Sequence, residues 1–144
     1  MQFPAGPLDM GGDEDCLFLN IYTPGLTGSR PVMVYIHGGA FIGGSGESWT
    51  YGPSYFMHEN VVIVTINYRL GILGFLSTGD AAAQGNYGLK DQAESFRWVK
   101  KNIAAFGGNP DDVTIFGESA GSASVNYQIL SRGSTGVSEI SKNN

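Results

Sequence analysis

The sequence predicts an α/β fold, with a mixed, mostly parallel β-sheet and helices flanking it. Two almost unbroken apolar runs, residues 32–36 and 61–68, are rich in β-branched side chains, which is typical of strands buried on both faces of a parallel sheet. A long segment with helical periodicity, residues 87–106, follows them. Strand-like and helix-like segments alternate along the chain, as expected of an α/β sheet.

Four segments are predicted as strands because apolar and β-branched residues dominate them. They are residues 17–23 (LFLNIYT), 32–36 (VMVYI), 61–68 (VVIVTINY) and 113–116 (VTIF). Glycine is unusually frequent, at 22 of 144 residues. Its clusters fall between the apolar runs, so they indicate turns and not a low-complexity tract.

Two helices are predicted. The first spans residues 87–106, where apolar residues at spacings of three and four form one face: Leu89, Ala93, Phe96, Val99, Ile103 and Phe106. Acidic residues in its first half and lysines near its end suit the helix dipole, and Gly107 supplies a C-terminal stop. A shorter helix is expected from just after Ser119 to about Leu130.

Composition argues against several classes of function. The net charge is −5 and there is no basic patch, which argues against nucleic acid or an anionic membrane surface as partner. No apolar run approaches the roughly 18 residues of a membrane span. No His, Cys and Asp cluster has metal-ligand spacing, and no phosphate-cradling loop precedes a helix. We therefore expect neither a metal nor another cofactor.

We expect a single domain, because the chain has no internal repeat and no long linker. Residues 1–131 would form it, whereas residues 132–144 (RGSTGVSEISKNN) are polar and aperiodic and are expected to be a disordered tail. The first sixteen residues hold no basic segment followed by an apolar one. No secretory signal is predicted, and the cellular location stays open.

The segment GESAG, residues 117–121, fits the Gly-x-Ser-x-Gly pattern of a nucleophile elbow. In such an elbow a serine occupies a strained turn between a strand and a helix, and the glycines two positions away avoid clashing with it. The predicted strand before Ser119 and the predicted helix after it supply this context. The alternative is a glycine-bounded turn serine without chemistry.

A second motif, HGGAF at residues 37–41, directly follows the predicted strand at residues 32–36. A glycine-rich turn lets backbone N–H groups point into a cavity, and such donors stabilise the oxyanion that forms in acyl transfer. The expected donors are the N–H groups of Gly39, Ala40 and Ala120. A turn of no chemical use is the alternative.

Several blocks of the sequence are specific as an ordered set. They are GGDEDCLFLNIYTP, PVMVYIHGGAFIGGSG, VVIVTINYRLGILGFLS and GNYGLKDQAESFRWVKKNIAAFGGNPDDVTIFGESAGSASV. In order and spacing they resemble the type-B carboxylesterase and cholinesterase family of α/β-hydrolases, and their residues are most similar to those of insect carboxylesterases. The resemblance covers roughly residues 11–131. It implies a partial α/β-hydrolase fold, with residues 1–131 as the N-terminal part of a carboxylesterase type-B domain.

The resemblance implies a carboxylic ester hydrolase that acts on small-molecule esters through an acyl-serine. The matching site residues are Ser119 as nucleophile, Gly39, Ala40 and Ala120 at the oxyanion hole, Gly38 and Glu118 as auxiliary residues and Phe41 as a substrate contact. Glu118 either shapes the electrostatics of the site or fills its position without a role. Phe41 either lines the acyl site or packs beneath the loop.

The acid and the histidine that would complete a catalytic triad with Ser119 are not found at the expected positions in the sequence. In this fold the triad acid and then the histidine follow the serine, yet downstream of Ser119 the chain has one acid, Glu139, and no histidine. His37 belongs to the oxyanion loop in the family pattern, and His58 is expected to be a solvated loop residue. We therefore expect an N-terminal portion, truncated after the elbow, with little or no ester turnover by itself.

Two alternatives to an enzyme stay open. The family includes adhesion proteins whose esterase-like domain binds partners and usually lacks the nucleophile, so the intact GESAG favours an enzyme. The chain can also be read as a gene fragment without independent function. Full-length members of the family are often secreted or lumenal.

Overall fold

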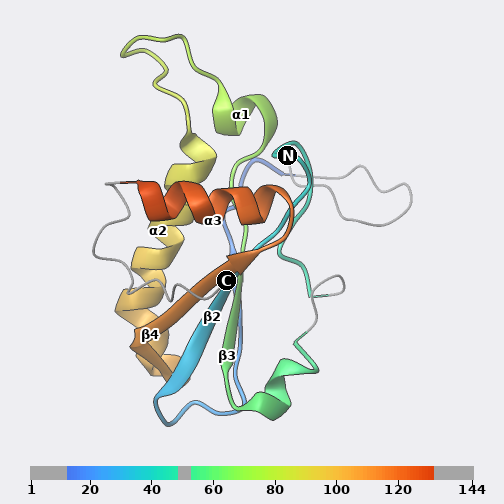
Figure 1. Cartoon of the computed structure of the whole chain (residues 1–144), viewed down its shortest axis with the longest axis vertical. Helices are drawn as coiled ribbons and strands as arrows, with labels where there is room; N and C mark the ends of the chain where they lie inside the picture. Colours follow the sequence, from blue (N-terminus) through green and yellow to red (C-terminus); the bar gives the residue numbers. More distant parts are fainter. Residues whose placement is uncertain (1–12, 49–52, 132–144) are drawn as a thin grey trace.

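The computed structural model describes residues 13–48 and 53–131 (Figure 1). Its strands form one sheet in the order β1-β3-β2-β4. They are β1 (Leu19–Tyr22), β2 (Arg30–Ile36), β3 (Val62–Ile66) and β4 (Gly108–Gly117). β1 runs antiparallel to β3, whereas β2 runs parallel to both β3 and β4. The predicted mixed, mostly parallel sheet is confirmed, although β4 begins earlier than residue 113.

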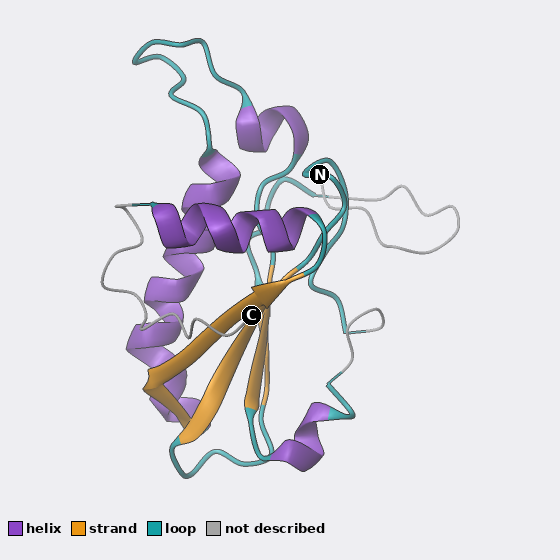
Figure 2. Cartoon of the chain, viewed as in Figure 1, coloured by secondary structure: helices purple, strands orange, loops and turns teal. Residues whose placement is uncertain are grey.

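Helices pack against this sheet (Figure 2). The described helical elements are the 3-10 turn η1 (Phe56–Glu59), α1 (Gly71–Phe75), α2 (Tyr87–Asn102), the 3-10 turn η2 (Ile103–Phe106) and α3 (Ala120–Leu130). Both predicted helices are confirmed: α2 continues into η2, which ends at Gly107 with φ 76°. η1 and α1 were not predicted. The predicted tail, residues 132–144, lies outside the described residues.

The core lies between the central strands and α2. β3 is buried along its whole length, as expected from its position between β1 and β2. The buried core side chains of β2, β3, α2 and η2 include Val32, Val34, Ile36, Val62, Val64, Ile66, Phe96, Val99 and Ile103. Each large one contributes about 1.5–3 kcal/mol relative to an exposed position. This core fixes the strand ends from which the site loops emerge.

The parallel strands bring the two sequence motifs together. β2 and β4 are neighbours in register, with Ile36 opposite Gly117. Residues 37–41 follow β2 and Ser119 follows β4, so both motifs lie at the carboxyl edge of the sheet, where ligands bind in open α/β folds. η1 precedes β3 and therefore lies at the opposite edge (Figure 1).

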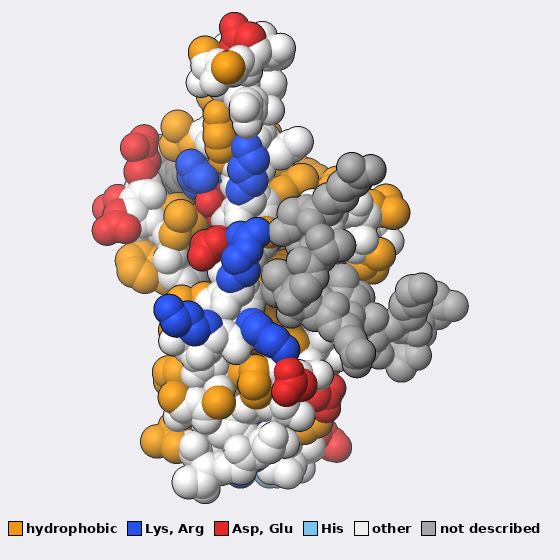
Figure 3. Space-filling view, turned by 90° about the vertical axis from the view of Figure 1, so that its left-hand side faces the viewer, with side chains coloured by type: hydrophobic (Ala, Val, Ile, Leu, Met, Phe, Trp, Pro, Cys, Tyr) orange, Lys and Arg blue, Asp and Glu red, His pale blue; other side chains and the backbone are white. Residues whose placement is uncertain are grey.

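One side of the molecule, which holds α2, carries a row of basic side chains (Figure 3). Three ion pairs lie on or beside α2: Arg69–Asp91 at 2.7 Å, Arg97–Glu94 at 2.7 Å and Lys100–Asp111 at 2.6 Å. These acids offset part of the positive charge. Among the described residues, no helix is long and apolar enough to cross a membrane.

Candidate active site

Ser119 occupies a sharp turn between the end of β4 and the start of α3. Its φ is 55° and its ψ is −118°, a conformation that residues with a side chain rarely adopt and that costs about 1–3 kcal/mol. Ser119 is exposed, although Ala120 and Gly121, which follow it, are buried. The strand-to-helix turn that the motif requires is present, with the serine at its tip.

Glycines on both sides of Ser119 allow this turn to close. A Cβ atom at Gly117 would lie 2.5 Å from the carbonyl carbon of Gly121. A Cβ atom at Gly121 would collide with the carbonyl oxygen of Ile36, at the end of β2. The first turn of α3 therefore lies directly against β2. The GESAG motif therefore requires glycine at positions 117 and 121, because a side chain at either would clash with the backbone.

The loop of residues 37–41 packs against the same turn. Gly38 is buried, and a Cβ atom there would lie 3.0 Å from the Cβ atom of Ser119 and 2.8 Å from the carbonyl oxygen of Glu118. After Gly38 the backbone has three consecutive positive φ values, 105°, 53° and 62°, at Gly39, Ala40 and Phe41. This conformation is costly at a residue with a side chain, so surrounding contacts must hold the loop.

Hydrogen bonds close the loop and leave three amides unused. The N–H groups of Ile42 and Gly43 donate to the carbonyl oxygen of Gly39, at 3.0 and 3.1 Å. Within the described part of the chain, the N–H groups of Gly39, Ala40 and Ala120 donate to no other residue. The N–H of Ala120 is also one of the helix N-terminal donors that lack an intrahelical partner. The predicted oxyanion donors are thus available at this edge of the sheet.

His37 lies beneath the loop and not beside the serine. It is fully buried, its ring stacks on that of Tyr68 with centroids 4.5 Å apart, and the Tyr68 hydroxyl donates to the His37 carbonyl oxygen at 2.9 Å. Its Nδ1 atom lies 2.7 Å from the carbonyl oxygen of Gly38. Burial lowers the pKa of His37, and the hydrogen bond to Gly38 opposes that shift. The stacking on Tyr68 and the contact with the Gly38 carbonyl oxygen let the buried ring support the loop.

Neither histidine of the chain acts on Ser119 in this geometry. Among the described residues, Ser119 makes no side-chain hydrogen bond to His37. His58 is exposed in η1, at the opposite edge of the sheet. Tyr68 was not predicted as a site residue, because its position at the end of a β-branched run indicates only a strand residue.

Phe41 and Glu118 lie at the margins of the turn. Glu118 is exposed, and its carboxylate lies near Gly38, where it would meet an added Cβ atom. Phe41 is half-buried and packs edge-on against Phe75 of α1, with ring centroids 5.2 Å apart. This contact is compatible with packing of Phe41 beneath the loop, and its role at the acyl site stays a prediction.

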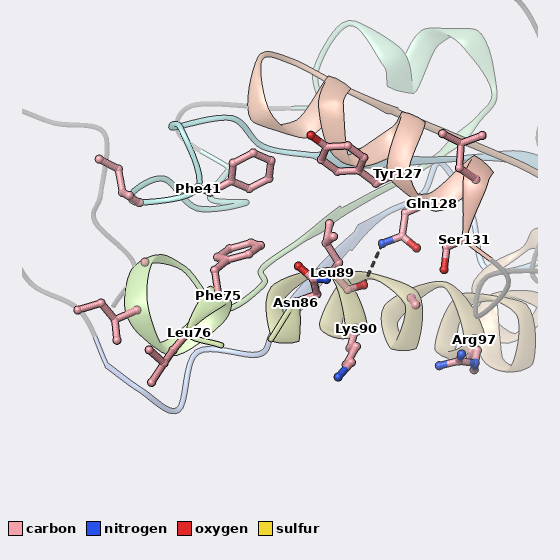
Figure 4. A pocket seen from close by; sticks show the side chains of 15 residues that line it. Phe41, Phe75, Leu76, Asn86, Leu89, Lys90, Arg97, Tyr127, Gln128 and Ser131 are labelled. Atoms are coloured by element: carbon pink, nitrogen blue, oxygen red, sulfur yellow. Dashed lines mark hydrogen bonds between the residues drawn. The ribbon is translucent and has the colours of Figure 1, made fainter. Parts of the chain in front are cut away.

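An apolar groove of about 1120 Å³ opens from Phe41 between α1, α2 and α3 (Figure 4). Its apolar lining includes Phe41, Ile42, Ile72, Phe75, Leu76, Leu89, Tyr127 and Leu130, and Lys90 and Arg97 contribute its cationic part. Ser119 is not among the lining residues. The groove and the serine turn therefore share the loop, through Phe41, but not the serine itself.

Comparison with known proteins agrees with this geometry. The profile of the carboxylesterase family matches residues 1–140. The chain belongs to the carboxylesterase family. This carboxylesterase-family chain is 54% identical to juvenile hormone esterase of Tribolium castaneum over 128 residues, which cover 88% of this chain and 22% of that protein. It is 47% identical to neuroligin-2 of Mus musculus over 146 residues, covering 86% and 17% respectively.

A solved structure of the family has the same fold. The crystal structure of juvenile hormone esterase from Manduca sexta, with OTFP covalently attached, superimposes with a TM-score of 0.84 and 43% sequence identity. The match covers 87% of this chain and 24% of that one. This carboxylesterase-family chain thus has a partial α/β-hydrolase fold, and it spans about a fifth to a quarter of the length of these esterases.

Proposed function

We propose that this chain carries the nucleophile and oxyanion hole of a serine carboxylic ester hydrolase. The observation that supports the proposal most strongly is the pairing of a strained, exposed Ser119 with three unused amides at one edge of the sheet. Such preorganised donors are aimed at the place where negative charge develops in acyl transfer. Membership of the carboxylesterase family supports the same reaction.

In the proposed reaction, the Oγ atom of Ser119 attacks the carbonyl carbon of an ester, and the carbonyl oxygen becomes an oxyanion. The N–H groups of Gly39, Ala40 and Ala120 donate hydrogen bonds to that oxygen. The Oγ proton passes to solvent. Collapse of the tetrahedral intermediate breaks the bond to the alkoxide, which takes a proton from solvent and leaves as the alcohol; water then hydrolyses the acyl-serine to the acid and free Ser119. Gly38 lets the loop approach the serine closely, because it has no side chain.

We propose that the substrates are small-molecule carboxylic esters. Phe41 would contact the ester from the loop, supported by Phe75 behind it. The carboxylate of Glu118 would add negative charge beside the serine and so shape the field in which an ester binds. Glu118 directly precedes Ser119, and Phe41 lies in the loop whose Gly38 packs against the serine turn; these positions support both assignments.

Attack by Ser119 requires a base for its proton, and neither His37 nor His58 hydrogen-bonds Ser119. We therefore propose that this chain by itself has slow turnover, because an active site without its general base keeps only about 10³–10⁴-fold of acceleration over water. A reactive probe tests the site more sensitively than turnover, since one covalent event per chain is enough to detect.

A fluorophosphonate probe tests the proposal. We expect a single phosphonyl adduct, mapped to Ser119 by mass spectrometry of peptides, and no adduct in Ser119→Ala. Ser122→Ala is the matched control, because Ser122 is an exposed serine in the first turn of α3. Labelling of a folded Ser119→Ala chain at the wild-type rate would contradict the proposal.

Similarity to neuroligin-2 makes a non-catalytic binding module the second candidate. The exposed elbow serine and the glycine contacts around it favour the enzyme, since a binding surface needs neither strain nor free amides at that point. Absence of any adduct on a chain shown to be folded would favour the binding module.

A further inference from the structure

The strained conformation of Ser119 requires contacts that hold it from more than one side. One side is β2, against which Gly121 packs. The other is α2, and here the contact between α2 and α3 is not purely apolar. Gln92 and Ser124 are fully buried, and Gln128 is 3% exposed. Buried polar side chains are costly unless they are hydrogen-bonded, so their presence in a helix contact requires a reason.

These three side chains form one directional chain of hydrogen bonds. Gln128 Nε2 donates to the Leu89 carbonyl oxygen at 2.9 Å, drawn in Figure 4, and to Gln92 Oε1 at 3.1 Å. Gln92 Nε2 donates to Ser124 Oγ at 3.0 Å. Ser124 Oγ donates to the Ala120 carbonyl oxygen at 2.9 Å. Successive bonds of this kind polarise one another. The donations from Gln128 to Gln92, from Gln92 to Ser124 and from Ser124 to Ala120 run toward the start of α3, whereas the one to Leu89 ends on the backbone of α2.

The end of this chain is the residue that follows the serine. Ala120 contributes both the carbonyl oxygen that accepts from Ser124 and the N–H group placed at the oxyanion hole. The turn itself has two further bonds, from Gly121 N–H to the Glu118 carbonyl at 2.8 Å and from Ala123 N–H to the Ser119 carbonyl at 3.0 Å. Among the side-chain hydrogen bonds of the described residues, the one from Ser124 ties this turn to α2 through Gln92.

We infer that Gln92 and Ser124 are positioning residues for the nucleophile turn. They fix Ala120 from the α2 side while β2 fixes Gly121 from the other, and together these contacts hold Ser119 in its strained conformation. The consequence for ester chemistry rests on the proposed function, whereas the consequence for the backbone of Ser119 does not. Neither residue contacts the substrate in this account.

Three variants separate positioning from stability. Ser124→Ala and Gln92→Met each break the link from α2 to Ala120: the first leaves Gln92 Nε2 without its acceptor, and the second leaves Ser124 Oγ without the donor from Gln92. The double variant Gln92→Met with Ser124→Ala removes both partners, so its stability should lie nearer to wild type than that of either single variant. Ser122→Ala is the matched control, because it makes the same change at an exposed position of α3.

The first measurement is nuclear magnetic resonance of the whole chain. A residue with positive φ gives an intense cross-peak between its own amide and α protons, and we expect this signature for Ser119 in wild type and in Ser122→Ala. It should weaken in Ser124→Ala, in Gln92→Met and in the double variant. A wild-type signature in folded double variant would overturn the inference.

The second measurement is the rate of fluorophosphonate labelling, corrected for the fraction of folded chain by denaturant titration. We expect a loss of about tenfold in the double variant, smaller than the roughly hundredfold expected for a displacement of about 1 Å. A purely structural role predicts no loss per folded molecule and would contradict the inference. If a single variant does not fold, the double variant carries the test. If wild type shows the Ser119 signature but takes no label, the proposed function fails and the positioning role stands.

Discussion

The two edges of the sheet differ in the backbone conformations that they contain. The five non-glycine residues with positive φ among the described residues are Ala40, Phe41, Asn60, Asn86 and Ser119. The two asparagines cap η1 and α2, and asparagine tolerates this region well. The three other residues all lie at the carboxyl edge, in the loop and the elbow. Costly backbone conformations therefore gather where chemistry is proposed and are avoided elsewhere, as expected of a functional site.

The core shows the opposite character. β3 is buried throughout, and its side chains Val62, Val64 and Ile66 have no exposed surface. Its stability comes from apolar burial in ordinary strand geometry. The elbow instead depends on close backbone contacts between Gly121 and Ile36. Changes in the core should therefore reduce stability alone, whereas changes at the elbow should alter both stability and the reactivity of Ser119.

The largest effect is expected for Gly121→Ala. The added Cβ atom would collide with the Ile36 carbonyl oxygen, so we expect a loss of about 3 kcal/mol or more in the free energy of unfolding. Urea denaturation measures this. Gly79→Ala is the control, since Gly79 has φ 76° and open space around it; it should lose about 1–2 kcal/mol. Because Gly121 has no positive φ, a loss near zero in Gly121→Ala would show that the β2 contact contributes nothing.

Ile66→Ala should lose about 2–5 kcal/mol, because it removes a fully buried side chain from β3. Per folded molecule, however, Ser119 should react with a fluorophosphonate at the wild-type rate. The comparison requires the labelling rate and the unfolding curve of the same sample. A labelling defect as large as that of Gly121→Ala would remove the distinction between core and elbow.

Acid should destabilise the fold through His37. Burial lowers its pKa in the folded chain, so below about pH 6.5 the unfolded chain binds a proton that the folded chain does not. The contribution of His37 to the free energy of unfolding is complete above that pH. It is lost as the pH falls, by at most about 1.4 kcal/mol per pH unit. Urea titrations of His37→Gln at several pH values should show a shallower dependence than wild type. A His37→Gln chain with the same pH dependence as wild type would contradict this assignment to His37.

The smallest effect is expected for Glu94→Gln. Its ion pair with Arg97 is 2.7 Å long but mostly solvent-exposed, and such pairs contribute about 0.3–0.5 kcal/mol on a helix. Thermal unfolding in low and high salt measures the difference, which should vanish as salt screens the charges. A larger, salt-independent loss would mean that the α2 surface stabilises the fold more than the charge pair accounts for.

Much of the fold could be predicted from the sequence because its signals are strong. β3 is an apolar β-branched run, and α2 has an apolar face sustained over several turns. α1 was missed because Gly71 and Gly74 interrupt a five-residue helix that is too short for any periodicity. The earlier start of β4 was missed because its first residues, GNPDD, are turn-forming in sequence and are held in the sheet by pairing between Arg30 and Gly108.

Parts of the site were predictable for a different reason. Gly117, Ser119 and Gly121 have the fixed spacing of a nucleophile elbow, so the motif itself predicts the turn that they form. Gln92 was not predicted to be buried, because the buried face of α2 was identified from its apolar residues alone. Its position three residues after Leu89 places it on the buried face of α2, and this spacing was the available signal. The stacking of His37 on Tyr68 joins residues distant in sequence and has no local signal.

The most direct test of the account is nuclear magnetic resonance of the phosphonylated chain. A phosphonyl group on Ser119, formed with loss of fluoride, places a strongly polar phosphoryl oxygen where the oxyanion would form. The amide protons of Gly39, Ala40 and Ala120, which have no acceptor among the described residues, should then shift downfield more than any others. If an adduct forms on Ser119 and these three amides do not move, the oxyanion hole is not where this account puts it.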